Sequence, residues 1–338
     1  MRVIIFGAGG VGGTIGARLH LAGTEVVLIA RGAHLEALAA SGLTFAAPDG
    51  EHVLRIPAVG HPRDVDWREG DVVLLTVKSQ HTVAALDDLA AAAGREVPVV
   101  CAQNGVANER MALRRFPRVY GMLINLPAIH LKPGEVVTHA AGTGGILDTG
   151  RFPEGVDALV EALMERLTRA GFSARPDPRV MRKKYAKLLM NLGNIVQAAT
   201  VPPEGEGAAS LPQEEAEAAK QVYRLLRAEA LECFEAAGID CASREEVRAR
   251  HENTYRMVDV PGHARPGGSS WQSLSRGTGN VETDYLNGEI SLLGSLHGVP
   301  TPANRVCQEV ADRMVSEDLP VGSFRPSQLL AMMESNGE

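Results

Sequence analysis

The sequence predicts a mostly parallel α/β domain with helices on both faces of its sheet, followed by an all-α domain, within 338 residues. Up to about residue 175, short β-branched or apolar runs alternate with Ala-rich amphipathic stretches, an alternation typical of βαβ units. After Pro178 the apolar residues recur at helical spacing, and no convincing strand follows. We therefore expect two domains, residues 1–176 and 177–338.

The first domain should contain five parallel strands, in the runs VIIF, EVVLIA, DVVLLTVK, VPVVCAQN and RVYGMLI. Asp49-Gly50 lies between two short apolar runs and predicts a hairpin. VVTHA and GGILD are expected as further short strands, before a helix over 156–170. In the second domain we expect helices at about 179–200, 212–237, 244–258, 281–297 and 303–316, with a break at 202–207.

The composition excludes several classes of protein. No stretch reaches the about 18 apolar residues that a membrane span requires. A formal charge of −7 gives no general attraction to nucleic acid or to anionic lipid. The four cysteines form no CxxC pair, and the first apolar run is too short for a signal peptide. We expect a soluble, cytoplasmic protein with reduced thiols and no nucleic-acid or membrane partner.

A glycine-rich segment directly follows the first strand, at Gly7, Ala8, Gly9, Gly10, Val11 and Gly12. It opens an amphipathic helix over 11–21 that leads into the second strand, which is the order of a dinucleotide-binding Rossmann unit. The glycines allow a tight turn and bring a pyrophosphate close to the helix N-terminus. The alternative is a flexible turn that binds no ligand.

Arg31 ends the second strand, where NAD-binding proteins usually carry Asp or Glu for the ribose 2′-hydroxyl. A guanidinium suits a 2′-phosphate, so NADP(H) is the expected cofactor, and a solvated surface charge is the alternative. Lys78 and Asn104 follow two other strands and should face the same crevice, because ligands bind beyond the carboxyl ends of strands in such sheets. Asn104-Gly105 is equally an ordinary turn.

The predicted helix over 179–200 carries a polar stripe. At about 100° per residue, Asn191 and Asn194 lie within about 40° of Lys187 around the helix axis. If the stripe lines a pocket, desolvation lowers the pKa of Lys187, which could then protonate a ketone oxygen as hydride reaches the carbon. A polar outer face is the equal alternative. Lys183 and Lys184 are expected to be surface charges.

Residues 280–288 predict the start of a helix, with Asn280 as N-cap. Glu282 and Asp284 would lie in its first turn, where the helix dipole favours anions, and this explains them without catalysis. The histidines show no metal-ligating spacing, so no metal site is expected.

Almost the whole chain resembles the ketopantoate reductase (2-dehydropantoate 2-reductase) family. The matching features are GxGxxG at 7–12, Arg31, Lys78, Asn104-Gly105, Lys187 with Asn191, Ser270 ahead of Glu282, and the segment 298–304. The resemblance implies NADPH-dependent reduction of 2-dehydropantoate to (R)-pantoate, by hydride transfer to the keto carbon of this small 2-oxo acid.

The resemblance also implies roles for the matched residues. Lys187 and Glu282 are the catalytic pair, with Lys187 as general acid and with Glu282 and Asn191 holding polar groups of the substrate. Ser270 helps to bind the substrate carboxylate. Asn104 helps to position cofactor and substrate, and Lys78 lies near the cofactor.

Three departures from the family pattern concern the substrate side. Ile195 replaces the family's frequent second asparagine, with Asn194, a candidate substrate-binding residue, one position earlier. Whether Asn194 takes the place of that asparagine stays open. Tyr185 replaces a tryptophan, and residues 271–279 lack the usual Met-Leu-Gln-Asp. A different 2-oxo acid or β-keto acid is therefore an alternative substrate. A non-catalytic NADP(H)-sensing module and a purely structural Rossmann scaffold are alternatives of other classes. The oligomeric state stays open, with a homodimer as one alternative.

Overall fold

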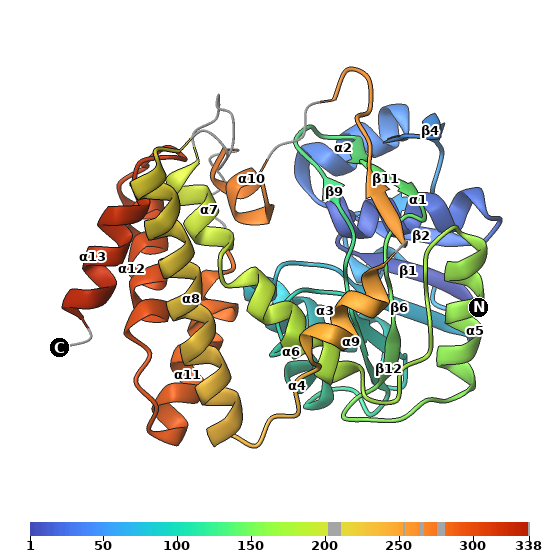
Figure 1. Ribbon diagram of the computed structural model, residues 1–338. Helices are drawn as coiled ribbons and strands as arrows, with labels where there is room; N and C mark the ends of the chain where they lie inside the picture. Colours follow the sequence, from blue (N-terminus) through green and yellow to red (C-terminus); the bar gives the residue numbers. More distant parts are fainter. Residues whose placement is uncertain (202–210, 253, 264–266, 276–280, 337–338) are drawn as a thin grey trace. The chain divides into compact units, whose positions relative to one another are not determined.

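The computed structural model describes residues 1–201, 211–252, 254–263, 267–275 and 281–336 (Figure 1). The chain forms two compact units, one of residues 1–184 with 242–265 and one of residues 185–241 with 266–338. The observed boundary thus differs from the predicted 176/177. It falls inside helix α6 (Val180–Asn191), and a later stretch of chain returns to the first unit.

The first unit is built on a seven-stranded sheet in the order β12-β8-β7-β6-β1-β2-β5. Neighbouring strands are parallel, except that β12 is antiparallel to β8. The strands are β1 (Arg2–Phe6), β2 (Val26–Ile29), β5 (Ala58–Val59), β6 (Asp71–Leu75), β7 (Val99–Cys101), β8 (Val119–Met122) and β12 (Thr149–Arg151). The five predicted parallel runs are β1, β2, β6, β7 and β8. The predicted strand at GGILD is wrong, because β12 begins one residue after it.

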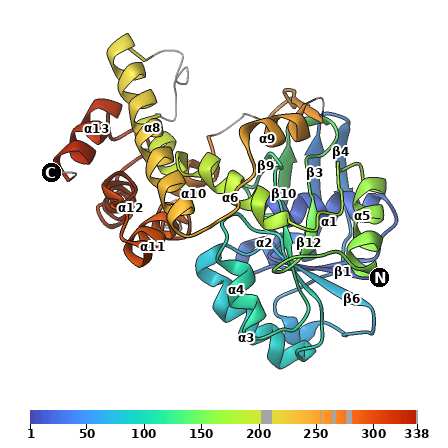
Figure 2. The same cartoon turned by 60° about the horizontal axis from the view of Figure 1, so that its bottom comes forward.

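Side chains alternate along β1 between two cores. Val3 and Ile5 pack in the core that includes α1 (Gly10–Leu21) and α5 (Ala158–Arg169). Ile4 and Phe6 pack in the other core, with residues of α3 (Thr82–Ala93) and α4 (Asn108–Leu113). Figure 2 shows α3 and α4 on the opposite side of the sheet from α1. A strand covered on both faces has no polar side, which explains the continuous apolar run.

A second sheet lies beside α1, in the order β4-β3-β10-β9. Its strands are β3 (Leu43–Ala47), β4 (Gly50–Leu54), β9 (Ala128–Ile129) and β10 (Glu135–Thr138), and α2 (Gly32–Ser41) leads from β2 into it. The hairpin predicted at Asp49-Gly50 is confirmed, with Ala47 opposite Gly50 in the β3–β4 pair.

The predicted helix over 244–258 is correct only in its first half. Helix α9 spans Arg244–His251, after which β13 (Tyr255–Met257) pairs antiparallel with β11 (Ala140–Gly142). The expectation that no strand follows residue 178 is therefore wrong. Pairing with a distant strand overrides the local helical periodicity, as tertiary context does for short segments.

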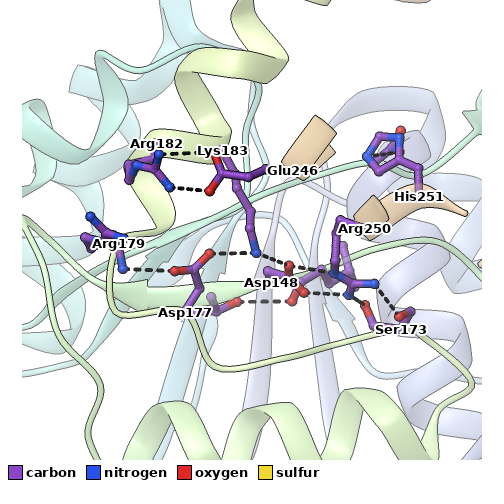
Figure 3. Close-up of polar contacts among 12 residues, drawn as sticks. Asp148, Ser173, Asp177, Arg179, Arg182, Lys183, Glu246, Arg250 and His251 are labelled. Carbon is purple, nitrogen blue, oxygen red and sulfur yellow. Dashed lines mark hydrogen bonds and ion pairs between the residues drawn. The ribbon is translucent and has the colours of Figure 1, made fainter. Parts of the chain in front are cut away.

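A buried ionic network holds this returning segment in the first unit (Figure 3). Asp148 is fully buried and accepts hydrogen bonds from Arg250 Nε and Nη2, at 2.8 and 2.6 Å, and from Lys183 Nζ at 2.8 Å. Lys183 Nζ also lies 2.8 Å from Asp177, and Arg250 donates to Ser173. Burial alone would raise the pKa of Asp148, but the bonds from Arg250 and Lys183 outweigh it and hold that pKa below its ordinary value.

Lys183 and Lys184 are not ordinary surface charges, so that prediction is wrong. Lys184 is only 3% exposed. Its Nζ lies 2.5 Å from Oε1 of the fully buried Glu109 and donates to the carbonyl oxygen of Gln103 at 3.0 Å. A buried ammonium requires such a counter-charge, and this one comes from α4, far away in the sequence.

The described part of the second unit is helical, which confirms the all-α prediction. Its helices are the end of α6, α7 (Asn194–Thr200), α8 (Gln213–Ala236), α10 (Ser269–Ser275), α11 (Asn287–His297), α12 (Pro302–Ser316) and α13 (Pro326–Ser335), with a 3₁₀ turn, η4, at Thr283–Tyr285. Figure 1 shows α8, α12 and α13 packed together. The sequence did not predict α10 or α13. No helix in the described ranges is long and apolar enough to span a membrane.

The single helix predicted over 179–200 is divided at Gly193. Helix α6 ends at Asn191, and α7 begins at Asn194. A Cβ at Gly193 would overlap the ring of Tyr223 on α8. The glycine therefore permits a close approach of α8 at the point where the helix is interrupted. The predicted break at 202–207 and the predicted N-cap Asn280 lie outside the described residues.

Asp148→Ala is expected to lower the free energy of unfolding by about 3–5 kcal/mol, because it leaves the buried Arg250 without its carboxylate and removes one of the two carboxylates that Lys183 contacts. Urea unfolding followed by circular dichroism measures the change. Glu165→Ala is the control, since Glu165 pairs with Arg169 on the surface of α5, and its loss should cost at most about 0.5 kcal/mol.

The contribution of Asp148 is present above the pKa of an unfolded aspartate, about 3.9, and is lost as pH falls through the lowered folded value. The difference between wild type and Asp148→Ala should therefore shrink in acid. If Asp148→Ala and Glu165→Ala lowered the free energy of unfolding equally at neutral pH, that result would contradict the role assigned to the ionic network.

Candidate functional site

The glycine-rich turn lies at the carboxyl end of β1, and its glycines serve different purposes. Gly7 has φ +114°, and a Cβ there would lie 2.7 Å from the backbone nitrogen of Val77. A Cβ at Gly12 would overlap the carbonyl oxygen of Gly7. Around a Cβ at Gly9, by contrast, the described residues leave open space to 4 Å. Packing therefore requires Gly7 and Gly12, whereas Gly9 leaves room for a ligand over the turn.

A cavity of about 330 Å³ opens over this turn. It is lined by the carboxyl ends of β1, β2 and β6, where β2 and β6 lie on opposite sides of β1. Ligands bind at such reversals of strand order. Its lining residues are Phe6, Gly7, Ala8, Gly9, Ile29, Ala30, Arg31, His34, Thr76, Val77, Lys78, His81, Ala85 and His130. The structure thus gathers five predicted cofactor residues in one cavity: Gly7, Ala8, Gly9, Arg31 and Lys78.

The other predicted residues of the turn form the start of a helix. Gly10, Val11 and Gly12 are the first residues of α1, and Gly9 is its N-cap. The first N–H groups of a helix have no acceptor within the helix, and they carry the positive end of its dipole. The turn therefore offers backbone donors suited to an anion.

Two cations flank the cavity. The Arg31 side chain is 63% exposed, and its Nη2 lies 3.8 Å from Oδ2 of Asp88. Lys78 is the partly buried N-cap of the 3₁₀ turn η2 (Ser79–His81) that follows β6. The exposed guanidinium of Arg31 can reorient toward a phosphate, since a surface ion pair at this distance contributes little.

Asn104 is partly buried after β7 and does not belong to the described lining of this cavity. Its backbone carbonyl accepts a hydrogen bond from Asn108 Nδ2 at 3.1 Å. Gly105 has φ +78°, a conformation that favours glycine. The chain bends at Asn104-Gly105, as the alternative interpretation of this pair expects.

The second unit holds the other predicted site residues. Lys187 and Asn191 lie four residues apart on α6, and so on one face of it. Asn194 begins α7, against which α10, the helix that carries Ser270, packs. Asn194 Oδ1 would lie 3.9 Å from a Cβ at Gly268, just before that helix.

Ile195, at the position of the family's second asparagine, is 2% exposed and belongs to the apolar interior. Glu282 is the N-cap of η4 rather than a first-turn residue of a longer helix.

Sequence reasoning missed a chain of buried amides in this unit. Asn287 Nδ2 donates to the carbonyl oxygen of Leu192 at 3.1 Å and to Asn304 Oδ1 at 3.0 Å. Asn304 in turn donates to Glu229 Oε2 at 2.7 Å. These hydrogen bonds join Leu192, the residue after Asn191, to Asn287, which follows Glu282 in the sequence. Asparagines at otherwise apolar helical positions were the available signal.

The polar groups of this unit have unusual surroundings. Burial lowers the pKa of Lys187 to about 8. Asn191 is 6% exposed, and its Nδ2 has no hydrogen-bond acceptor among the described residues. The hydroxyl of Thr283, beside Glu282, is likewise buried without a described partner. Buried polar atoms are rarely left unsatisfied, so these two indicate where a polar ligand would complete the hydrogen bonding.

Comparison with known proteins finds one family in both parts of the chain. A protein-family model described as "Ketopantoate reductase PanE/ApbA" matches residues 3–154. A second family model, "Ketopantoate reductase PanE/ApbA C terminal", matches residues 179–314. A 2-dehydropantoate 2-reductase of Mesorhizobium japonicum is 28% identical over 327 residues, which cover 89% of this chain and 94% of the relative.

Solved structures share the fold. A PanE/ApbA family ketopantoate reductase from Ralstonia eutropha matches with a TM-score of 0.72 and 26% identity over 100% of both chains. A ternary complex of D-mandelate dehydrogenase with NADH and anilino(oxo)acetate matches with a TM-score of 0.76 and 23% identity, covering 94% of this chain and 99% of that one. The second likeness concerns the fold alone.

Gly12→Ala and Gly9→Ala should differ in their effect on stability. The new methyl group at position 12 overlaps the Gly7 carbonyl oxygen and should cost on the order of 1–3 kcal/mol, or more if the turn cannot shift. At position 9 it points into open space with φ −71°, so the cost should stay within about 1 kcal/mol. Thermal unfolding measures both. A loss at Gly9 as large as that at Gly12 would show that protein atoms occupy the space over the turn.

Proposed function

The chain belongs to the ketopantoate reductase family, and on this premise we propose that it is an NADPH-dependent 2-oxo acid reductase that converts 2-dehydropantoate to (R)-pantoate. The observation that carries the proposal is the cavity over the glycine turn, which Gly9, the N-cap of α1, lines together with Arg31 and Lys78. In this proposal the first unit holds the cofactor, and the second supplies the acid.

The residues of the cavity fit a dinucleotide. Gly9 leaves open the space that a pyrophosphate would fill, and the first N–H groups of α1 can hold its oxygens. Arg31 can exchange Asp88 for a 2′-phosphate, which favours NADPH over NADH. When bound, NADPH supplies the hydride that reduces the keto carbon.

The protonated Lys187 completes the reduction by giving a proton to the keto oxygen, which becomes a hydroxyl group. A pKa of about 8 suits this step, because the ammonium is largely protonated at neutral pH and yet releases its proton more readily than an exposed lysine. The unsatisfied Asn191 Nδ2 can donate to a substrate oxygen. Glu282 accepts from a substrate hydroxyl, and Ser270 donates to the carboxylate.

A second candidate is a reductase of another 2-oxo acid. Ile195, at the position of the family's frequent second asparagine, is buried and offers no polar group to a substrate, and Asn194 begins a different helix from the one that carries Lys187. The proposed substrate residues could therefore suit a different side chain on the oxo acid.

Substrate choice and cofactor choice can be tested together by following NADPH oxidation. We expect turnover of 2-dehydropantoate to exceed that of pyruvate, 2-oxoisovalerate and phenylglyoxylate, and NADPH to be preferred over NADH. Arg31→Ala should raise the KM for NADPH about 10–100-fold, the equivalent of one charge-assisted contact, and leave that for NADH unchanged. Arg55→Ala, which removes an exposed arginine outside the cavity, is the control. Negligible turnover of 2-dehydropantoate beside fast turnover of another acid would replace the proposed substrate.

Lys187→Ala should lower kcat by about 10²–10⁴-fold with the Kd for NADPH unchanged, because only the proton donor is removed. Lys220→Ala is the control, since Lys220 is an exposed lysine of α8 paired with Glu217. In the wild type, the rate of reduction should fall as pH rises through about 8, where Lys187 loses its proton. Unchanged turnover in Lys187→Ala would exclude it as the acid, and NADPH binding without turnover of any oxo acid by the wild type would indicate a sensing module.

A further inference from the structure

His34 connects three segments of the first unit that are far apart in the sequence. It lies on α2, and its ring lines the cavity over the glycine turn. Its Nε2 lies 2.8 Å from the carbonyl oxygen of Ala8, and its Nδ1 accepts a hydrogen bond from the backbone N–H of Gly134 at 2.8 Å. One ring thus bonds to the glycine turn on one side and to the loop before β10 on the other.

These two contacts admit a single protonation state of the ring. A carbonyl oxygen only accepts, so Nε2 carries a proton, and a backbone N–H only donates, so Nδ1 keeps its lone pair. A second proton on Nδ1 would point at the N–H of Gly134. Burial and the His130 ring, whose centroid is 4.4 Å away, lower the pKa of His34 to about 4, although the bond to Ala8 opposes the shift.

The bond to Ala8 acts on the peptide group that leads into Gly9. Because a peptide is planar, the direction of the Ala8 carbonyl also sets the direction of the Gly9 N–H. That N–H donates to the Gly7 carbonyl oxygen at 2.8 Å, and the Ala8 N–H donates to Ile29 at 3.2 Å. Gly9 has no side chain to pack, so hydrogen bonds of the backbone hold the turn in place.

The hydrogen bond between His34 and Gly134 depends on close packing of the loop against α2. Gly134 has φ +77°, and a Cβ there would lie 2.9 Å from Ala37 Cβ on α2. The glycine lets the loop approach α2 closely enough for its N–H to reach His34. Two residues later, Val136 of β10 packs against Gly13 of α1. The loop whose Gly134 bonds to His34 therefore continues into β10, and β10 packs against α1, the helix that follows the glycine turn.

We infer that His34 is a positioning residue of the cofactor site, whose neutral Nε2–H imidazole fixes the Ala8–Gly9 peptide and so keeps the glycine turn in the conformation over which the pyrophosphate lies. The inference rests on the proposed function for the identity of the ligand. His34 need not touch the reacting atoms. It acts through the turn, so its loss should weaken dinucleotide binding before it affects the chemical step.

NADPH binding to three variants, followed by fluorescence titration without any oxo acid, tests the inference. His34→Leu removes both hydrogen bonds and should raise the Kd for NADPH about 10-fold or more. His34→Gln supplies one donor and one acceptor and should keep the Kd within about 3-fold of wild type. His52→Leu, which replaces an exposed histidine of β4, should leave it unchanged. A His34→Leu variant with a lower Tm but an unchanged Kd would overturn the inference, because His34 would then be only structural.

The tautomer can be read in the wild type without ligand, so the inference stays testable even if His34→Leu fails to fold. Long-range ¹H–¹⁵N spectra at neutral pH should show His34 as neutral with its proton on Nε2, and a proton on Nδ1 would overturn the inference.

The inference and the proposed function fail in different ways. Tight NADPH binding that depends on His34, without turnover of any oxo acid, would refute only the reductase. Turnover with a His34→Leu Kd equal to that of wild type would refute only the positioning role. A wild type that binds no NADPH would refute both.

Discussion

The contact between Gly12 and the carbonyl oxygen of Gly7 is the constraint on which the cofactor half of the protein depends. No side chain fits there, so α1 can begin directly at the end of β1. Gly9, the N-cap of α1, lines the cavity, and the ends of β2 and β6 bring Arg31 and Lys78 to the same place. A larger residue at Gly12 would separate α1 from the end of β1 and so move the helix N-terminus away from the turn.

Buried ion pairs also determine which segments belong to the first unit. Asp148 binds both Lys183 and Arg250, and Glu109 binds Lys184. Such pairs contribute modest net stability, since desolvation offsets much of their attraction, but a chain that left either partner alone would bury an uncompensated charge. They therefore select the arrangement in which α6 begins in the first unit and α9 returns to it.

The proposed substrate residues depend on a different interaction, within the second unit. Asn287 bonds to the carbonyl oxygen of Leu192, which follows Asn191 at the end of α6, and to Asn304, which is fully buried. This holds together the segments that carry Asn191 and Glu282. The polar stripe predicted for one helix is shared between two, with Lys187 and Asn191 on α6 and Asn194 at the start of α7, and Gly193 between them leaves room for Tyr223.

The sequence by itself determined the features that depend on neighbouring residues: the apolar runs of β1 and β6, the turn at Asp49-Gly50, the glycines before α1 and the helical periodicity of the second unit. Only the tertiary structure decided which distant groups meet. It paired β13 with β11, buried Lys184 against Glu109 and placed His34 between Ala8 and Gly134. The physical reason is that spacing along the chain reports the backbone conformation and which face is buried, whereas the partner of a buried polar group is chosen by packing between elements far apart in the sequence.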